Sequence, residues 1–416
     1  MKYLSDTGWD SMFLNLSLFS FGALALLFSS GYSVGPFLII IFLLLVLPFK
    51  AKVDIDKDDL IFSSVFILFF TVGVFDTVLR GQSVSNLDLF SRYLLGAFVI
   101  FYLSQRNIKE SFLLMGFAVG AIGASVWALY AKFILDMPRV KTEHLDPVNF
   151  GNISLLMGLI SLTSVFWALE QKKKPLAALM LLAFFCGMTA SLLSGSRSGW
   201  VALPLALFAL YKIYEEILKD KVKKAALVGF VAFVAIFALL PDTGVQHRIS
   251  LIFSDIEHYT QGHSTTSIGL RFEMWRSAYE AIIQKPVFGW GEAGFYEFQA
   301  NMVEQMNLNP MILDFKHLHN QYIEELAKRG VIGLVALLLV FIVPFKLFYK
   351  KSQTGNKRTK PLAAAGVVVI ICMADFCLTQ GMLRITSAVM FFVFTLVFIW
   401  CCIRALEKRE IIQSPA

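Results

Sequence analysis

Residues 386–403 read TSAVMFFVFTLVFIWCCI, a stretch that holds no charged side chain and is mostly apolar. A helix rises about 1.5 Å per residue, so a stretch of this length spans most of the bilayer's hydrocarbon core, which is about 30 Å thick. Apolar stretches of similar length recur along the chain, separated by short charged segments. The sequence therefore predicts an all-α integral membrane protein with about twelve transmembrane helices.

Hydropathy divides the chain into two membrane segments and one long hydrophilic loop. Residues 1–241 hold nine expected spans, residues 242–330 form the loop, and residues 331–416 hold three more spans and a cytoplasmic tail. The loop is too short and too poor in apolar residues for a large core, so we expect amphipathic helices that lie over the membrane domain. The expected spans cover residues 12–29, 33–49, 60–78, 87–104, 111–133, 149–169, 175–194, 199–214, 225–241, 331–349, 361–380 and 386–403.

The composition excludes several other classes of protein. Of the 416 residues, 57% are hydrophobic and 16% are charged, against about 25% charged residues in a typical soluble domain. The net charge of +7 does not indicate a nucleic-acid partner, because Lys and Arg lie in short loops beside apolar spans. All five cysteines lie in or at the edge of apolar spans, so a disulfide framework is not expected.

The distribution of Lys and Arg predicts the orientation of the chain. If the N-terminus is cytoplasmic, the cytoplasmic loops hold more than half of the 37 Lys and Arg residues, and the longer outside loops are poorer in them. Both termini are then cytoplasmic, and the loop of residues 242–330 lies outside. The expected cytoplasmic segments are 50–57, 106–109, 172–174, 212–224, 346–360 and 404–409.

Three segments on the predicted outer side carry candidate binding residues. In the first, Gly195-Ser196-Arg197-Ser198-Gly199 joins two spans, and its small residues would let a ligand approach the backbone. Arg197 could hold a phosphate or diphosphate through two parallel hydrogen bonds. The alternative is an interfacial Arg that extends toward lipid headgroups.

The second segment is an expected amphipathic helix that starts near Thr265–Ser267, which supply candidate N-caps. Arg271 and Trp275 are four residues apart and share a helix face. They could bind an anion and stack on a sugar or a lipid. The alternative is a solvated Arg beside an interfacial Trp, and for Arg276 we expect this solvated state.

The third segment runs from His317 to Gly330. His319 and Ile323 fall on one helix face, and Gly330 is a natural helix end before the next span. A His beside a lipid diphosphate could act as a general base, since its unperturbed pKa is about 6.5. Residues two apart on a helix do not face each other, so we do not expect His317 and His319 to share a metal ion.

One acidic residue falls inside an apolar span. Asp375 lies toward the outer end of the span 361–380, where ionisable side chains are costly and usually functional or paired. It could orient His319 or neutralise an Arg. The alternative is a structural partner for Arg384 or Arg197.

At these residues the chain resembles the O-antigen ligase family, within the O-antigen ligase/polymerase superfamily of bacterial membrane glycosyltransferases. The family signature is His, then Asn, Ser or Gln, nine residues, Gly, two residues, and a small residue. It is met here by His319-Asn320, Gly330 and Gly333. The family pattern Arg-x-x-x-Trp followed by Pro-x-x-Gly-x-Gly is met by residues 271–275 and 286–291.

The resemblance implies a reaction and a fold. Family members transfer preassembled O-antigen polysaccharide from undecaprenyl diphosphate to a core sugar of lipid A–core. The reaction takes place on the periplasmic side of the bacterial inner membrane, in a glycosyltransferase fold of the GT-C type. It is regarded as inverting and as needing no metal, no other cofactor and no ATP. The implied partners are the lipid-linked polysaccharide donor, the lipid A–core acceptor and membrane lipids.

The resemblance also implies roles for individual residues. Arg197 looks like the family's other essential arginine, and Asp375 loosely resembles its acidic residue near the end of the eleventh span. We expect His319, Arg197 and Arg271 to be the catalytic residues, with His319 as the base and both Arg side chains on the diphosphate. The expected substrate-binding residues are Arg197, Arg271, Trp275, His317, Asn320, Tyr322 and Asp375.

The implied chemistry fits these side-chain types. A lipid diphosphate is already a good leaving group, so it needs charge stabilisation more than protonation. A sugar hydroxyl is a poor nucleophile, and a general base typically accelerates its attack by about 10²–10⁴-fold.

Three alternative functions are open at this stage. An O-antigen polymerase would use the same donor but extend a lipid-linked glycan. A protein O-oligosaccharyltransferase often carries an additional C-terminal soluble region, whereas this sequence ends shortly after its last span. A lipid or polysaccharide transporter would place polar residues along a path through the membrane, whereas the polar candidates here gather at one face.

Overall fold

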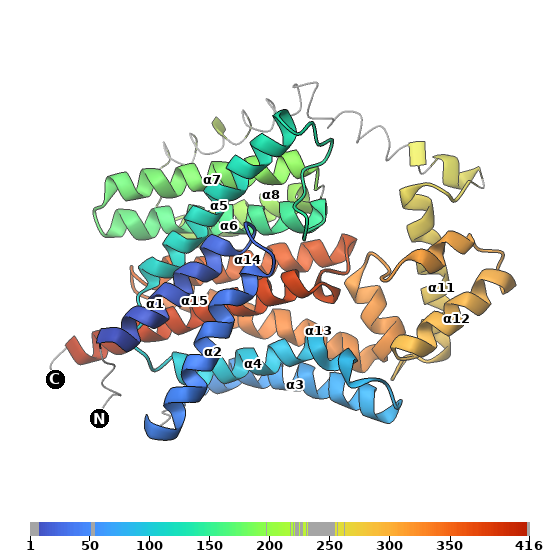
Figure 1. The fold of residues 1–416 in the computed structure, drawn as a ribbon, viewed down its shortest axis with the longest axis horizontal. Coiled ribbons are helices and arrows are strands. Elements are labelled where there is room, and N and C mark those ends of the chain that lie inside the picture. The colour runs from blue at the N-terminus through green and yellow to red at the C-terminus, as the bar shows by residue number, and fades with distance from the viewer. Residues whose placement is uncertain are drawn as a thin grey trace. The chain divides into compact units, whose positions relative to one another are not determined.

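The computed structural model describes residues 8–50, 55–196, 198–216, 257–261 and 263–413, with a few single positions between 218 and 255. Within these residues the regular structure is helical and no strand is present, so the predicted all-α class is confirmed (Figure 1). The main helices are α1 (Gly8–Leu24), α2 (Gly31–Lys50), α3 (Lys57–Leu79), α4 (Asp88–Leu103), α5 (Glu110–Phe133), α6 (Pro147–Glu170), α7 (Lys174–Ser194), α8 (Ser198–Tyr214), α11 (Ser267–Gln284), α12 (Glu292–Gln305), α13 (Gln321–Thr354), α14 (Lys360–Thr379) and α15 (Thr386–Gln413). Short 3₁₀ helices are η1 (Val84–Leu87), η3 (Pro310–Asp314) and η4 (Met382–Arg384).

The chain divides into two compact units. The membrane unit comprises residues 1–210, 336–377 and 382–416. The loop unit comprises residues 211–335 and the short segment 378–381. Helix α13 therefore begins in the loop unit and continues in the membrane unit.

Among the described residues, 8 helices are long and apolar enough to cross a membrane. Gly31–Leu45 and Val201–Tyr214 form shorter apolar helices. Each expected span falls on a helix except 225–241, which lies almost entirely outside the described residues. The prediction of a multi-pass membrane protein is confirmed, while the count of twelve stays a prediction.

Helix α15 forms the centre of the membrane unit. Its apolar stretch is 100% buried within the structure, against 39% for that of α3. A helix that is hydrophobic on all sides is stable only when neighbours or lipid surround it, and here other helices supply the cover. The Trp400 indole N–H donates to Asp59 Oδ1 at 2.7 Å, which joins α15 to the start of α3.

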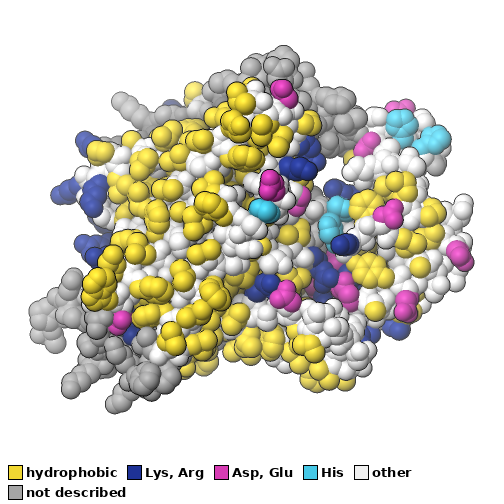
Figure 2. Space-filling model, in the orientation of Figure 1, with side chains coloured by type: hydrophobic (Ala, Val, Ile, Leu, Met, Phe, Trp, Pro, Cys, Tyr) yellow, Lys and Arg dark blue, Asp and Glu magenta, His cyan; other side chains and the backbone are white. Residues whose placement is uncertain are grey.

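The outer helices of the membrane unit expose large apolar side chains. Phe37 on α2 and Phe208 on α8 are each 61% exposed. Hydrophobic side chains cover much of this unit in the space-filling view (Figure 2). Contiguous apolar surface of this extent is typical of a protein that contacts lipid.

Close packing of α6 and α7 depends on two glycines. A Cβ atom on Gly187 would lie 2.6 Å from the carbonyl oxygen of Ser154 and 2.7 Å from Cα of Gly158. Small residues let helix backbones approach closely in membranes, where dispersion contacts and hydrogen bonds replace the hydrophobic effect. The pair therefore lets α7 pack closely against α6, and α7 ends at Gly195.

The loop unit has a small apolar core between α11 and α12. Met274 and Ala278 from α11 pack with Phe295 and Phe298 from α12, and each of these side chains is buried. Helix α11 begins where the Thr266 hydroxyl accepts a hydrogen bond from Gly269 N–H at 3.1 Å, within the predicted capping segment. This core gives α11 and α12 a defined arrangement within the loop unit.

Candidate functional site

The first turn of α13 is set by Asn320. Its Oδ1 accepts hydrogen bonds from the backbone N–H groups of Tyr322 and Ile323, both at 3.0 Å, which is an N-cap. Its Nδ2 donates to the Leu378 carbonyl at 3.1 Å. The second residue of the His–Asn signature therefore starts the helix and ties it to the end of α14 within the loop unit.

His319 lies directly before this cap in a left-handed backbone conformation, with φ at +52°. The residue is half-buried, and Nδ1 lies 2.6 Å from Oε1 of Gln380. An amide oxygen can only accept, so Nδ1 carries the proton and Nε2 keeps its lone pair. The Gln380 side chain thus holds the ring in the tautomer that a general base requires.

The residue before His319 is held on both sides. The Leu318 N–H donates to Oε2 of Glu324 at 3.1 Å, and the Leu318 carbonyl accepts from the Trp275 indole N–H at 2.8 Å. Trp275 comes from α11 and Glu324 from α13. The second half of the Arg-x-x-x-Trp pattern therefore positions the backbone that presents His319.

A buried ion cluster supports Glu324. Lys328 is 0% exposed, and its Nζ lies 2.6 Å from Oε1 of Glu324 and 3.0 Å from Oε1 of Glu292. A buried charge is tolerated only when it is paired, and one Lys between two carboxylates meets that condition. The cluster fixes the carboxylate whose other oxygen holds Leu318.

Gly289 of the Pro-x-x-Gly-x-Gly pattern and Gly330 of the His–Gly signature lie where two backbone segments approach each other closely. Gly289 and Gly330 each have φ at +63°, and the chain kinks at Gly330 inside α13. A Cβ on Gly289 would lie 2.4 Å from the Lys328 carbonyl carbon, and one on Gly330 would lie 2.2 Å from the Val287 oxygen. The predicted helix end at Gly330 is confirmed. Its physical reason is the close approach of residues 286–291 to the kink.

Replacing Gly330 with Ala is expected to destabilise the protein by about 1–3 kcal/mol, because a side chain would be forced into a left-handed backbone and against Val287. Gly294 offers a matched control, since its Cβ would meet nothing closer than 3.9 Å. Gly294→Ala lies in α12 and should leave stability unchanged or slightly raised. Thermal unfolding of the purified variants measures both, and equal unfolding temperatures for Gly330→Ala and wild type would refute this close approach.

The environment of His319 lowers the pKa of its ring from 6.5 to about 4. Burial is the largest cause, followed by the neighbouring His317, and the charge of Arg271 acts in the same direction. The ordinary histidine pKa of about 6.5 expected from the sequence is wrong for His319, because the ring is partly buried. At neutral pH the ring is therefore neutral and able to accept a proton.

His317 and His319 face each other, although residues two apart on a helix would not. The helix starts only at Gln321, and the two ring centroids lie 4.3 Å apart. The helical geometry assumed for this pair was therefore wrong. Among the described residues, no group of three or more His, Cys, Asp and Glu side chains has a geometry that could hold a metal ion.

The remaining predicted site residues divide between the units. Arg271, Trp275, His317, Asn320 and Tyr322 belong to the loop unit together with His319. Asp375 belongs to the membrane unit, where it is 7% exposed near the end of α14. Arg197 lies outside the described residues. The roles predicted for Asp375 and Arg197 stay predictions.

Three residues that hold the His319 segment in place, Gln380, Glu324 and Lys328, were not among the predicted site residues. Gln380 lies 61 residues from His319, at the end of an apolar span, where a Gln carries no pattern of its own. Glu324 and Lys328 are four residues apart on α13, which is a recognisable helical ion pair. The i,i+4 spacing could have indicated this ion pair, but the same spacing is common in ion pairs on the surfaces of helices.

Parts of the chain are similar to known proteins. Residues 182–338 match the protein family described as O-antigen ligase. An uncharacterized protein of Haemophilus influenzae is 29% identical over 391 residues, which cover 91% of this chain and 95% of that protein. An O-antigen ligase of Escherichia coli K12 is 23% identical over 282 residues, 66% of each chain. A ComP-specific O-oligosaccharyltransferase of Acinetobacter baylyi is 24% identical over 215 residues, which are 50% of this chain and 36% of that protein.

The matched segment 182–338 contains Arg197, Arg271 and His319, together with Gly289 and Gly330. The two relatives with a named activity are glycosyltransferases, named for joining or transferring saccharides. Their matches cover only about two thirds and about one third of those proteins. The resemblance seen in the motifs is thereby confirmed over residues 182–338, where the chain matches the O-antigen ligase family.

Proposed function

We propose that this protein is an O-antigen ligase. It would transfer O-antigen polysaccharide from undecaprenyl diphosphate to a sugar hydroxyl of lipid A–core. His319 is the general base, and Arg197 and Arg271 stabilise the diphosphate. The observation that carries the proposal is the ring of His319, held through Nδ1 by Gln380 in the unit that also contains Arg271.

The reaction has one bond made and one broken at the anomeric carbon of the donor sugar. The acceptor oxygen forms a bond to this carbon while the carbon–oxygen bond to the diphosphate breaks. The hydroxyl proton passes to Nε2 of His319, and undecaprenyl diphosphate leaves with the bonding electron pair. Attack opposite the leaving group inverts the anomeric configuration, and the Arg guanidinium groups offset the charge that develops on the departing oxygen.

The membrane setting follows from the same proposal. A GT-C-type fold of twelve spans would place both termini in the cytoplasm and residues 242–330 in the periplasm, as the Lys and Arg distribution favours. Both substrates are lipids, so they would reach the site by lateral diffusion in the inner membrane. The energy of the diphosphate linkage drives the transfer, and neither a metal ion nor a nucleotide takes part.

Deletion of the gene in its native bacterium tests the function directly. The proposal predicts that long polysaccharide accumulates on undecaprenyl diphosphate while long-chain lipopolysaccharide disappears. Lipopolysaccharide that instead carries a single repeat unit would indicate an O-antigen polymerase and contradict the proposal. Complementation with the wild-type gene on a plasmid should restore the long chains.

The pH dependence of kcat/KM reports the pKa of the base in the free enzyme. The base must be neutral to act, and the pKa of His319 is about 4, so activity is retained above that pH and lost below it. We expect kcat/KM to fall as the pH drops through about 4 rather than through 6.5. The test is to measure initial rates from pH 3.5 to 8 by gel analysis of the product. This pH range includes both the lowered pKa of about 4 and the ordinary histidine pKa of about 6.5.

Two variants of Gln380 test whether its side chain orients the His319 ring or only supports the fold. Gln380→Glu would place a carboxylate against Nδ1, which favours the charged ring and raises its pKa, so the acid limb should move to higher pH. Gln380→Leu removes the bond and should lower kcat by up to about 10²-fold through loss of ring orientation. An acid limb that both variants leave unmoved, with an unchanged rate, would contradict the role of Gln380.

A further inference from the structure

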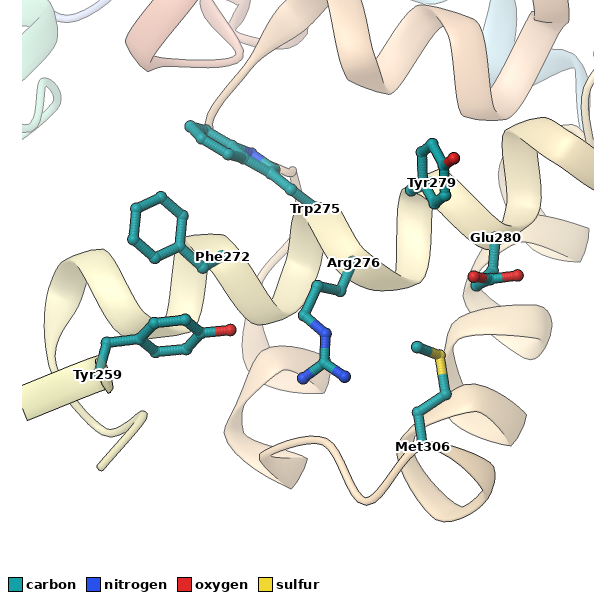
Figure 3. A pocket seen from close by; sticks show the side chains of 7 residues that line it. All are labelled: Tyr259, Phe272, Trp275, Arg276, Tyr279, Glu280 and Met306. Atoms are coloured by element: carbon teal, nitrogen blue, oxygen red, sulfur yellow. The ribbon is translucent and has the colours of Figure 1, made fainter. Parts of the chain in front are cut away.

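The loop unit contains a pocket of about 460 Å³ beside the loop that presents His319. Small-molecule sites have volumes of roughly 300–1,000 Å³, so the space is large enough for a ligand. Its walls include the aromatic rings of Tyr259, Phe272, Trp275 and Tyr279, and Figure 3 shows these side chains around α11. Of the residues that line it, only Trp275 is among the predicted substrate-binding residues.

One stripe of α11 builds most of the pocket. At 100° per residue, the order around the helix is Trp275, Tyr279, Phe272, Arg276 and Glu280, so an aromatic edge lies directly beside a charged edge. Tyr279 is 62% exposed, and the Arg276 side chain is 50% exposed. Exposed aromatic rings in a hydrophilic loop are available for contact with a ligand.

A buried carboxylate holds the polar groups of the pocket in place. Glu273 is 4% exposed, and its Oε1 accepts from the Tyr259 hydroxyl at 2.9 Å and pairs with Nη1 of Arg276 at 3.3 Å. Its Oε2 accepts from Asn309 N–H at 3.3 Å. The guanidinium has five donors, so one bond to Glu273 fixes it and leaves donors for a ligand. Arg276 is exposed, as expected from the sequence, and it is also held by this ion pair.

The pocket is joined to the catalytic loop through Trp275. The indole ring lines the pocket, and its N–H holds the carbonyl of Leu318, the residue before His319. A molecule that stacks on this ring therefore lies near the proposed base. The same contact would transmit a shift of the ring to the backbone of the catalytic loop.

The chemistry of the walls fits a saccharide. A pyranose ring has apolar C–H faces that stack on aromatic rings, and a rim of hydroxyl groups that bond to charged side chains. A lipid tail has no groups that would use Arg276 or Glu280, and burying these charges against it would be costly. The aromatic edge and the charged edge together favour a sugar over a lipid tail as the occupant of the pocket.

We infer that this pocket is a saccharide-binding subsite that holds a sugar unit next to the reaction centre. The inference rests on the proposed function, because that function brings two saccharides to this face: the donor polysaccharide and the lipid A core. Both present the same chemistry. The pocket would determine which sugar is aligned with His319, and so would contribute to specificity.

Direct binding to the full chain in lipid nanodiscs tests the inference. The three probes are O-antigen polysaccharide released from its lipid, core oligosaccharide released from lipid A, and undecaprenyl diphosphate without glycan. Tyr279→Ala and Arg276→Gln should each weaken binding of one saccharide probe by about tenfold. Ile283→Ala is the matched control, since this side chain is 55% exposed on the same helix and lies outside the pocket.

Each outcome has one meaning. Weaker binding of the polysaccharide identifies a donor subsite, and weaker binding of the core oligosaccharide identifies an acceptor subsite. Unchanged binding of both, or an equal loss for undecaprenyl diphosphate, overturns the inference. Because binding is measured without turnover, pocket-dependent saccharide binding by a chain that makes no lipopolysaccharide would refute the proposed function and leave the subsite standing.

Discussion

Replacing His319 with Ala is expected to lower the rate of polysaccharide transfer by about 10²–10⁴-fold, the contribution typical of a general base. The neutral ring is the proposed acceptor of the hydroxyl proton, and Ala provides no group that can take it. His319 also has a positive φ, so Ala changes the backbone preference as well as the chemistry. His319→Asn addresses this point, because Asn tolerates the left-handed conformation but cannot act as the base.

The measurement is the initial rate of the purified variants, with thermal unfolding recorded alongside. The matched control is His263→Ala, an exposed histidine of the same unit, which should keep the wild-type rate. Folded His319→Ala and His319→Asn proteins that both transfer polysaccharide at the wild-type rate would exclude His319 as the base. A loss in His319→Ala alone would point to a conformational role.

Replacing Arg271 with Gln is expected to lower kcat by about 10²–10³-fold, comparable to the loss of one donor that stabilises a developing negative charge. Arg271 lies in the first turns of α11, and its positive charge acts to lower the pKa of His319. In the proposed reaction its guanidinium contacts the diphosphate with two parallel hydrogen bonds. Arg271→Lys keeps the charge but loses this fork, so its rate should fall between those of wild type and Gln.

Arg358 provides the control for Arg271. It is an exposed arginine of the membrane unit in the segment between α13 and α14, and Arg358→Gln should leave the rate unchanged. The measurements are kcat and KM for the lipid-linked donor at constant salt, because screening weakens contacts between exposed charges. Equal kcat values for Arg271→Gln and wild type would remove Arg271 from the diphosphate site.

Much of the membrane architecture could be predicted because bilayer thickness imposes a length on each apolar stretch. The expected span 386–403 falls within α15, and the span 111–133 matches α5 (Glu110–Phe133) almost to the residue. The predicted helix end at Gly330 also has a local cause, since Gly is the residue best suited to a positive φ. These features depend on residues that are close together in the sequence, so they could be predicted from the sequence alone.

The candidate site was only partly predictable. The motifs around Arg271 and His319 predicted that these two residues belong to one site, and both residues lie in the loop unit. The bond from His319 to Gln380 joins positions 61 residues apart, and that from Lys328 to Glu292 joins positions 36 residues apart. Such contacts depend on how helices pack, which periodicity and motif spacing do not report. The lowered pKa of His319 has the same origin, because burial is a property of the folded chain.

The most direct test of the central claim is transfer by the purified chain in proteoliposomes that contain EDTA. The donor is polysaccharide on undecaprenyl diphosphate, and the acceptor is lipid A–core. The account predicts that wild type forms polysaccharide-bearing lipopolysaccharide in the chelator and that His319→Asn does not. Longer lipid-linked polymer without transfer, a rate restored only by a divalent ion, or equal transfer by His319→Asn would contradict it.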